Sequence, residues 1–332
     1  MRRLGKTNID VTEIGLGGIP LQRLNVDEVK EVIEEMIKYK ANVIDTARGY
    51  TVSEELIGKA IKGKRHLFYL FTKSPARTFG GMKKDVVLSL KHLQTDYIDL
   101  YQFHNVKNIE EYNQIMSDKG AYHALLAAQK KGKIRHIGLT THNLDLLAEI
   151  IDDYPFDTLQ FPYNIVETQA ENIFKKAKQN DIGIIVMKPL AGGAIDNPQS
   201  ALKFILNNAN VSVVIPGMES PDQVKNNMAV INEFISVRDV NEMTRIRALL
   251  SDNFCRRCGY CMPCSAGIDI PTCFTFEGYY TRYGLKEWAE SRYLSLDKHA
   301  SDCIECHLCE SRCPYSLKIA DKMKYVETIF KL

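Results

Sequence analysis

Nine cysteines give the chain its clearest chemical signal, and all of them lie in the last quarter of its 332 residues. Eight fall into two runs: Cys255, Cys258, Cys261 and Cys264, then Cys303, Cys306, Cys309 and Cys313. The second run continues into Pro314 and matches the C-x2-C-x2-C-x3-C-P spacing of thiolates that hold iron–sulfur clusters. The first run is one residue shorter before its last cysteine, and Ser265 stands in place of the proline.

Zinc is the alternative ligand, because paired C-x-x-C units also bind it tetrahedrally. Two runs with a cysteine at nearly every third residue favour clusters instead. This region resembles the two-cluster, ferredoxin-type helical modules of many anaerobic redox enzymes. Crossed ligation in such a module would assign one 4Fe-4S cluster to Cys255, Cys258, Cys261 and Cys313. The other would take Cys303, Cys306, Cys309 and Cys264. Cys273 is left over, either as a buried apolar residue or as a replacement for Cys264.

Four side chains earlier in the chain form a second group with chemical potential. Asp45, Lys73 and His104 each end a short apolar run, and Tyr50 follows Asp45 by five residues. A phenol becomes a useful proton donor to a carbonyl when a nearby cation stabilises its phenolate form. Lys73, itself held by Asp45, would supply that cation, and His104 would orient the carbonyl.

Eight β-rich runs separated by amphipathic helical stretches must position this group. They span residues 12–18, 42–47, 66–73, 96–104, 134–141, 156–164, 182–189 and 211–217. Apolar strands that alternate with single helices are typical of a parallel sheet, and eight such units predict a (β/α)8 TIM barrel. The alternative is a doubly wound sheet, but the sequence lacks the G-x-G-x-x-G fingerprint of that fold, because "GLGGIP" leads into a proline and a long loop. In a barrel the active site lies at the carboxyl ends of the strands, where the four side chains stand.

The composition changes near residue 235, which predicts two domains. Residues 1–235 would form the barrel, and residues 236–332 a mainly α-helical domain that holds the clusters. Helical stretches at 237–252 and 274–296 adjoin the cysteine runs. No low-complexity linker separates the two, so we expect the domains to pack together.

Several motifs of the first domain, in order, resemble the aldo-keto reductase family. They are "NVIDTARGYTVSEELIGKAI", "FTKS", "LYQFHN", "IGLTTHN", "QFPYNIVE", "MKPLAGG" and "VVIPGMESPDQVKNN". The resemblance covers about residues 1–235 and implies NAD(P)-dependent interconversion of a carbonyl and an alcohol. Its catalytic tetrad would be Asp45, Tyr50, Lys73 and His104, with Tyr50 as the general acid.

The same resemblance implies a nucleotide site. Thr140, Asn143 and Gln160 would hold the carboxamide, and Tyr163 or a neighbour would stack on the nicotinamide ring. The remaining cofactor residues would be Lys188, Pro189, Leu190, Gly217, Met218, Ser220, Gln223 and Asn227. Glu219 stands where NADP-preferring members place a basic or small residue, and its carboxylate suits a free ribose 2′-hydroxyl. Both NAD and NADP therefore stay open.

Composition narrows the class of partner. The net charge of +2 gives no broad basic field, so we expect no nucleic-acid partner. The first residues lack the apolar core of a secretory signal, and no apolar run approaches a membrane span. We therefore expect a cytoplasmic protein without a membrane partner.

Three functions fit these patterns. The first is an oxidoreductase acting on a small carbonyl or alcohol, whose clusters exchange electrons with ferredoxin or another carrier. The second keeps the enzyme but makes the clusters structural, in a domain that caps the barrel mouth and lends Tyr279, Tyr280 or Arg282 to the substrate pocket. The third is a non-catalytic electron-transfer or redox-sensing subunit that uses the barrel as a scaffold. A hydride carries two electrons and a 4Fe-4S cluster accepts one, and the sequence shows no flavin signature to connect them.

Overall fold

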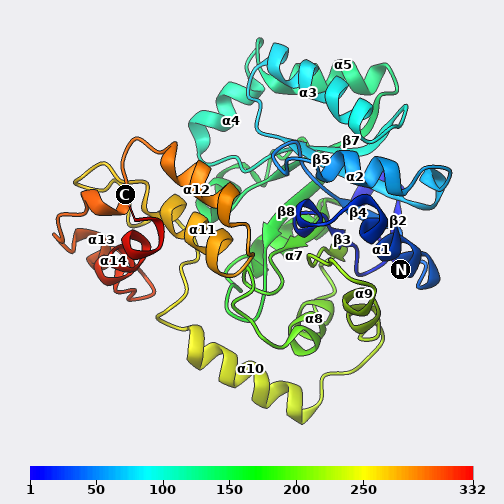
Figure 1. Cartoon of the computed structure of the whole chain (residues 1–332). Helices are drawn as coiled ribbons and strands as arrows, with labels where there is room; N and C mark the ends of the chain where they lie inside the picture. Colours follow the sequence, from blue (N-terminus) through cyan, green and yellow to red (C-terminus); the bar gives the residue numbers. More distant parts are fainter. Residues whose placement is uncertain (332) are drawn as a thin grey trace. The chain divides into compact units, whose positions relative to one another are not determined.

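The structure is a computed structural model that describes residues 1–331. Its internal contacts divide the chain into two units, and Figure 1 labels many of their elements. The first unit is Met1–Pro189 together with Pro198–Ser236. The second is Leu190–Asn197 together with the chain from Val237 onward.

An eight-stranded parallel sheet forms the centre of the first unit. Each strand pairs with the next along the chain: β3 (Leu16–Gly17), β4 (Val43–Asp45), β5 (Tyr69–Ser74), β6 (Ile98–Phe103), β7 (Ile134–Thr140), β8 (Thr158–Pro162), β9 (Gly183–Met187) and β10 (Val213–Val214). Parallel bridges from Ile14 to Val214 and from Gly17 to Gly217 join the first strand region to the last. The sheet therefore closes into a barrel, which confirms the predicted fold class and excludes an open doubly wound sheet.

Helices follow the strands and cover the outside of the barrel. They are α1 (Val26–Lys38), α2 (Ser53–Ala60), α3 (Phe79–His92), α4 (Ile109–Met116), α5 (Ala121–Lys130), α6 (Leu144–Ile150), α7 (Glu171–Gln179), α8 (Pro198–Leu206) and α9 (Pro221–Met228). Polar residues begin several of them: Asn25 caps α1 in a capping box with Glu28, and Thr78 caps α3. The apolar faces of the helices and the outward side chains of the strands form one large core.

The barrel interior has an apolar layer and a polar layer. The apolar cluster contains Val43, Phe71, Leu100, Ile185 and Val213, together with residues of the amino-terminal hairpin β1 (Arg2–Arg3) and β2 (Asp10–Val11). Side chains on a strand alternate between its two faces, so the next inward residues lie two positions further on. These include Asp45, Lys73 and Gln102, at the carboxyl ends of β4, β5 and β6. The fold thus places the predicted catalytic group above a packed apolar floor.

The second unit is helical apart from its cysteine loops. Its helices are α10 (Val237–Leu250), α11 (Ile270–Thr281), α12 (Lys286–Leu294), α13 (Leu308–Ser311) and α14 (Ile319–Phe330). The predicted helical stretch 274–296 is interrupted between α11 and α12, where Gly284 adopts a left-handed φ of 64° that a helix cannot contain. A separate core of this unit includes Ile270, Tyr293, Ile319 and Met323.

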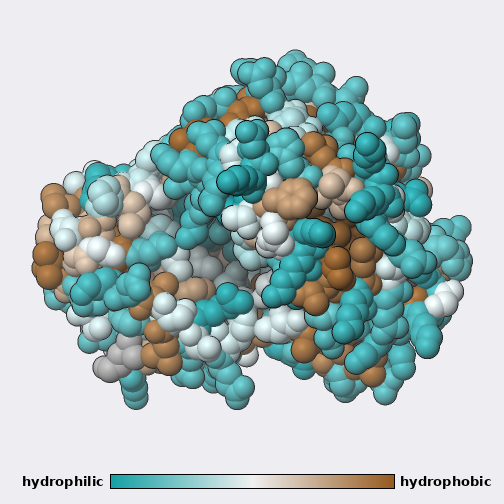
Figure 2. All heavy atoms as spheres, turned by 90° about the horizontal axis from the view of Figure 1, so that it is seen from above, coloured by the Kyte–Doolittle hydropathy of each residue, from teal (hydrophilic) through white to brown (hydrophobic). Residues whose placement is uncertain are grey.

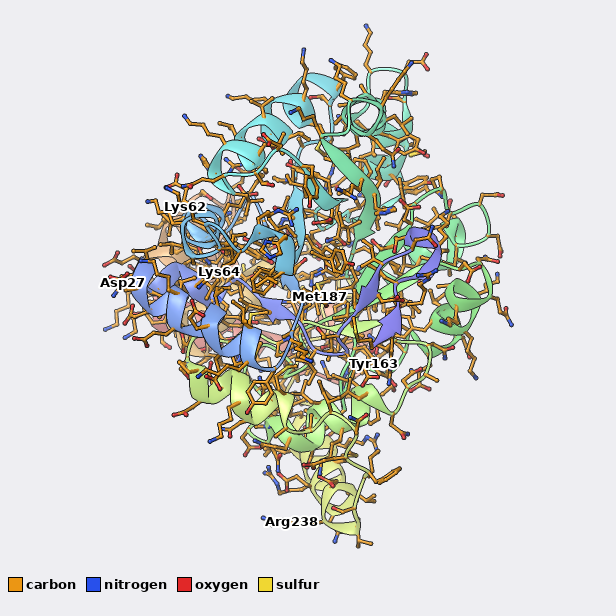
Figure 3. All side chains as sticks on the ribbon, turned by 90° about the vertical axis from the view of Figure 1, so that its right-hand side faces the viewer. Asp27, Lys62, Lys64, Tyr163, Met187 and Arg238 are labelled. Carbon is orange, nitrogen blue, oxygen red and sulfur yellow. The ribbon has the colours of Figure 1, made fainter. Side chains whose placement is uncertain are left out.

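The face drawn in Figure 2 is covered mainly by hydrophilic residues, with scattered apolar patches. In Figure 3, Lys62 and Asp27 lie at the edge of the molecule, as expected for solvated positions near the ends of α2 and α1. Within the described residues, no helix combines the length and apolar character that crossing a bilayer requires.

Candidate active site and cysteine-lined cavities

A buried ion pair lies at the centre of the candidate active site. The Lys73 ammonium contacts the Asp45 carboxylate and also donates to the carbonyl oxygen of Thr46 at 2.9 Å. Both side chains are enclosed, with Asp45 2% and Lys73 1% exposed. Gln102 Nε2 lies 3.4 Å from the second carboxylate oxygen of Asp45. A charged pair at this depth is held in one geometry by its own hydrogen bonds.

Burial changes the acid–base properties of this pair. It lowers the pKa of Lys73, and the carboxylate of Asp45 opposes that shift. Burial likewise raises the pKa of Asp45, against the opposing effect of Lys73. Perturbed ionisable groups at the carboxyl ends of barrel strands are typical of catalytic sites.

Tyr50 and His104 complete the group that the sequence predicts. The Lys73 ammonium lies 5.0 Å from the centroid of the Tyr50 ring. The ring of His104 meets that of Tyr50 edge to face, with centroids 5.9 Å apart and an interplanar angle of 87°. The structure therefore brings a phenol, a cation, a carboxylate and an imidazole together from β4, β5 and the loops after β4 and β6.

Backbone hydrogen bonds fix the loops that carry these side chains. His104 N donates to the carbonyl oxygen of Ser74 at 2.9 Å, which extends the pairing of β5 and β6. Asn105, at a left-handed φ of 52°, donates its backbone N–H to Thr140 Oγ1 at 2.7 Å. Asn105 Oδ1 also lies 2.8 Å from His142 Nδ1. Thr140 thus helps to fix the turn after His104, a role that the sequence did not indicate.

Gln160 fits a nicotinamide site. Its side chain is buried and hydrogen-bonds the Asp45 carboxylate. Its carbonyl oxygen Oε1 is buried without a hydrogen-bond partner. A buried acceptor without a donor is costly, and the amide N–H of a bound carboxamide would satisfy it.

Two residues predicted for the nucleotide have other partners. Asn143 Oδ1 accepts the Leu146 N–H and caps α6, while its Nδ2 donates to the carbonyl oxygen of Lys107. Tyr163 faces outward: its ring stacks on Phe204, and its hydroxyl donates to Glu171 Oε1 at 2.8 Å. The structure does not bring Tyr163 to Gln160, because Tyr163 directly follows β8 and, three residues after Gln160 in extended chain, points to the opposite face.

The remaining predicted nucleotide residues lie in the loops after β9 and β10 and on helix α9. Lys188 adopts a left-handed φ of 54° after β9 and, with Pro189, belongs to the first unit, whereas Leu190 belongs to the second. After β10 come Gly217, Met218, Ser220, Gln223 and Asn227. In that second loop the Met218 side chain is buried in the outer core, and Ser220 caps α9 through the Gln223 N–H. Asn227 lies buried on α9.

An ion pair at the second of these loops was not predicted. The Arg23 guanidinium contacts the carboxylate of Glu219. Gln223 Oε1 accepts the backbone N–H of Glu219 at 2.8 Å, which helps to fix the turn before α9. The carboxylate that the sequence singled out is therefore accompanied by a cation from the loop after β3.

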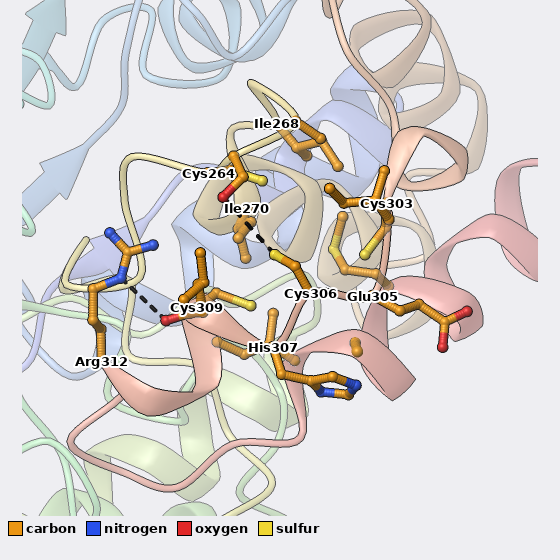
Figure 4. Close-up of a pocket in the computed structure, with 16 residues that line it drawn as sticks. Cys264, Ile268, Ile270, Cys303, Glu305, Cys306, His307, Cys309 and Arg312 are labelled. Atoms are coloured by element: carbon orange, nitrogen blue, oxygen red, sulfur yellow. Dashed lines mark hydrogen bonds between the residues drawn. The ribbon is translucent and has the colours of Figure 1, made fainter.

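The second unit contains two cysteine-lined cavities that match the crossed ligand sets. One, which with the solvent at its open side measures about 320 Å³, is lined by Cys255, Cys258, Cys261 and Cys313. The other, measured in the same way at about 400 Å³, is lined by Cys264, Cys303, Cys306 and Cys309. Figure 4 shows the second cavity, where the four cysteine side chains extend toward a common space. Arg312 joins the two cysteine segments at this cavity by donating to the carbonyl oxygens of Met262 and Pro263.

The two cysteine runs share one backbone conformation. In the first run Arg257 and Gly259 have φ of 57° and 85°, and in the second Glu305 and His307 have 52° and 57°. These residues flank Cys258 and Cys306, the second cysteine of each run. In the first run the Arg257 N–H donates to Cys255 Sγ at 3.4 Å, as expected where a loop turns its amides toward sulfur. The two runs therefore turn in a similar way around their second cysteines.

Cys273 lies apart from both cavities. It is fully buried on α11 within the core of the second unit, and burial raises the pKa of its thiol to about 12. It lines neither cavity, whereas Cys264 lines the larger one. The arrangement favours Cys273 as an apolar core residue.

Comparison with known proteins identifies both parts of the chain. The model of the Aldo/keto reductase family matches residues 13–200, which is more than half of the chain, and a 4Fe-4S dicluster domain matches residues 254–318. The chain belongs to the aldo/keto reductase family and carries a 4Fe-4S dicluster domain after its barrel.

Relatives of known description match up to 75% of the chain. L-Galactose dehydrogenase of Arabidopsis thaliana is 26% identical over 302 residues, which covers 75% of this chain and 94% of the relative. The NADH-specific methylglyoxal reductase of Escherichia coli is 25% identical over 322 residues, covering 74% of this chain and 98% of the relative. Among solved structures, the holo form of aldo-keto reductase AKR11C1 from Bacillus halodurans superimposes with a TM-score of 0.62 at 24% identity, covering 74% and 95% of the two chains. This last likeness supports the fold.

Proposed function

We propose that the protein interconverts a small carbonyl and its alcohol with NAD(P)H, and that Tyr50 is the general acid. The observation that carries the proposal is the buried Asp45–Lys73 pair beneath the Tyr50 ring, with His104 at its edge. A barrel that served only as a non-catalytic scaffold would have little reason to keep two buried charges, since burying them costs free energy.

A bound reduced nicotinamide would supply the hydride. The protein's own residues would then handle the proton and the charge. His104 orients the carbonyl, Tyr50 donates its hydroxyl proton to the carbonyl oxygen, and Lys73 stabilises the phenolate that remains. Asp45 keeps Lys73 fixed, so the cation needs no rearrangement during the reaction.

The nucleotide would be held by Gln160 at the carboxamide and by the loops after β9 and β10 at its other end. The Arg23–Glu219 pair presents both signs of charge near the expected ribose position. The carboxylate suits a free 2′-hydroxyl, while the guanidinium suits a 2′-phosphate. One relative is named as NADH-specific, which is consistent with recognition of a free 2′-hydroxyl. Titration with both nucleotides decides between NAD and NADP.

The two cysteine-lined cavities would each hold one 4Fe-4S cluster, with the crossed ligand sets that line them. Iron–sulfur clusters can store single electrons, and their bonds to cysteines also stabilise the fold of a small domain. A structural role needs no partner. Exchange of electrons with ferredoxin or a similar carrier is the second candidate, favoured by the exposure of Cys306, since a ligand at the surface shortens the path to a partner.

Substitution of Tyr50 by Phe tests the catalytic proposal. Removing the acid should lower kcat for a small aldehyde such as methylglyoxal by about 10²–10⁴-fold while nucleotide affinity stays unchanged. Tyr122→Phe is the control, because Tyr122 packs against Phe156 in the outer layer and should keep wild-type turnover. If Tyr50→Phe keeps wild-type turnover, the acid is another group. If the wild-type protein binds neither nucleotide, the scaffold function is favoured instead.

A further inference from the structure

Glu54 is a buried carboxylate that the proposed reaction does not use. It stands on α2, four residues after Tyr50, and only 1% of it is exposed. A carboxylate at this depth is destabilising unless its partners compensate the charge. The partners of Glu54 come from the two chain segments that carry Tyr50 and Lys73, which connects it to the candidate active site.

One oxygen of this carboxylate holds the segment before Tyr50. Arg48 NH1 donates to Glu54 Oε2, and the same nitrogen lies 3.0 Å from His92 Nδ1. The backbone N–H of Arg48 donates to the carbonyl oxygen of Lys73 at 2.9 Å. Arg48 is therefore fixed at both its backbone and its side chain, two residues before the proposed acid.

The other oxygen holds the strand that carries Lys73. The hydroxyl of Thr72, which is fully buried, donates to Glu54 Oε1 at 2.7 Å. Side chains alternate along β5, so Thr72 points outward to α2 where Lys73 points inward to Asp45. A single carboxylate thus joins the outer side of β5 to the turn that precedes Tyr50.

The charge of Glu54 also acts on the Lys73 ammonium. Burial lowers the pKa of Lys73, and the carboxylates of Asp45 and Glu54 both oppose that shift. Removal of the Glu54 charge would leave Arg48 as an uncompensated neighbouring cation, which disfavours the positive charge on Lys73. The protonated form of Lys73 therefore depends on a carboxylate on each side of β5.

Other ionisable groups lie on the elements packed around this cation. They are Tyr50 and His104 inside the barrel, Asp85 and His92 on α3, and Glu55 on α2. A change confined to the charge of Glu54 leaves all of these groups in the chain, so its effect on Lys73 can be measured by itself.

We propose that Glu54 is a positioning residue for carbonyl reduction. It fixes the turn that carries Tyr50 through Arg48, and its charge keeps Lys73 protonated. The inference rests on the proposed function, in which Tyr50 is the acid and Lys73 is its cation. Activity that needs a protonated Lys73 is lost as pH rises, so loss of the Glu54 charge moves the alkaline fall of kcat to lower pH.

The variant Glu54→Gln, in the anaerobically prepared full chain, keeps the size of the side chain and removes its charge. Methylglyoxal turnover across pH gives kcat and the KM for the nucleotide. We expect kcat to fall about tenfold near neutral pH at unchanged nucleotide KM, with the alkaline limb of the pH profile shifted to lower pH. Glu54→Asp keeps the charge and should keep the alkaline limb of the wild type. Glu55→Gln, at a neighbouring carboxylate whose side chain is 45% exposed, is the control and should behave as wild type does.

Three results would overturn the inference while the proposed function stands. The first is a wild-type kcat and pH profile in Glu54→Gln. The second is a lower kcat with the alkaline limb in place, since a structural defect alone would produce it. The third is an equal shift in Glu55→Gln, which would make the effect general to the charges of α2. If the wild type binds neither nucleotide, the proposed function fails and the inference fails with it.

A second variant keeps the inference testable should Glu54→Gln not fold. The double variant Arg48→Met/Glu54→Gln removes both buried charges, so that neither is left unpaired. It must show the same fall in kcat at unchanged nucleotide KM. A wild-type kcat in this double variant would overturn the inference.

Discussion

The buried Asp45–Lys73 pair is the residue-level feature on which the proposed chemistry depends. Each charge has lost its water and is compensated by the other and by the hydrogen bonds to Thr46 and Gln102. Such pairs contribute little net stability, because desolvation offsets their attraction. Their presence here is better explained by the phenol that they serve than by the packing of the barrel.

Substitution of Lys73 by Met tests this dependence. Removal of the cation leaves the Asp45 carboxylate buried and uncompensated, which should cost about 3–5 kcal/mol of unfolding free energy. The double variant Asp45→Asn/Lys73→Met removes both charges and should recover much of the stability but none of the carbonyl reduction. Urea denaturation measures the first effect and nucleotide oxidation the second. A double variant that regains turnover would show that the pair only supports the fold.

Sequence reasoning at this scale succeeded where residue type and strand position agreed. Asp45, Lys73 and His104 end strands that the fold brings to one rim, so their meeting with Tyr50 was predictable. The outward position of Tyr163 could also have been predicted, because an interval of three residues from Gln160 in extended chain changes the face to which a side chain points. The Arg23–Glu219 pair could not have been predicted, since it joins loops whose meeting depends on closure of the barrel.

At the scale of elements, the barrel strands and the cysteine loops follow different rules. The strands were predictable from apolar runs and helix spacing, and their closure follows from eight units of similar length. The cysteine loops depend on left-handed backbone conformations at Arg257, Glu305 and His307. The amino-acid types at these positions do not predict such conformations. The spacing nevertheless predicted that the first three cysteines of each run share a cavity, because short intervals let successive thiolates surround one space. The exchange of the fourth cysteine between the runs was implied by the resemblance to two-cluster modules.

Two cysteine substitutions distinguish ligand from core residue. Cys264→Ala removes a lining residue of the larger cavity and should lower the iron content from about eight toward about four atoms per chain, with the magnetic resonance signal of one cluster lost or altered. Cys273→Ala should keep both clusters and lose only stability, because it leaves a small cavity in the core. Iron and sulfide analysis of anaerobic preparations provides the readout. The reverse pattern would make Cys273 the fourth ligand.

On the scale of the whole molecule, one chain combines an aldo/keto reductase barrel with a 4Fe-4S dicluster domain. The loop Leu190–Asn197 belongs to the second unit although it continues directly from the end of a barrel strand. This assignment of the loop could not be predicted from the sequence, because it depends on contacts of Arg245 and Arg282 with residues about 50 and 90 positions away.

Direct hydride transfer is tested by an anaerobic single-turnover experiment. The cluster-loaded protein with bound reduced nucleotide is mixed with methylglyoxal, and nucleotide oxidation and the redox state of the clusters are recorded together. We expect one nucleotide to be oxidised for each carbonyl consumed, while the clusters keep their redox state. Clusters that become reduced as the nucleotide is oxidised, with no carbonyl consumed, would contradict carbonyl reduction at Tyr50 as the function of this protein.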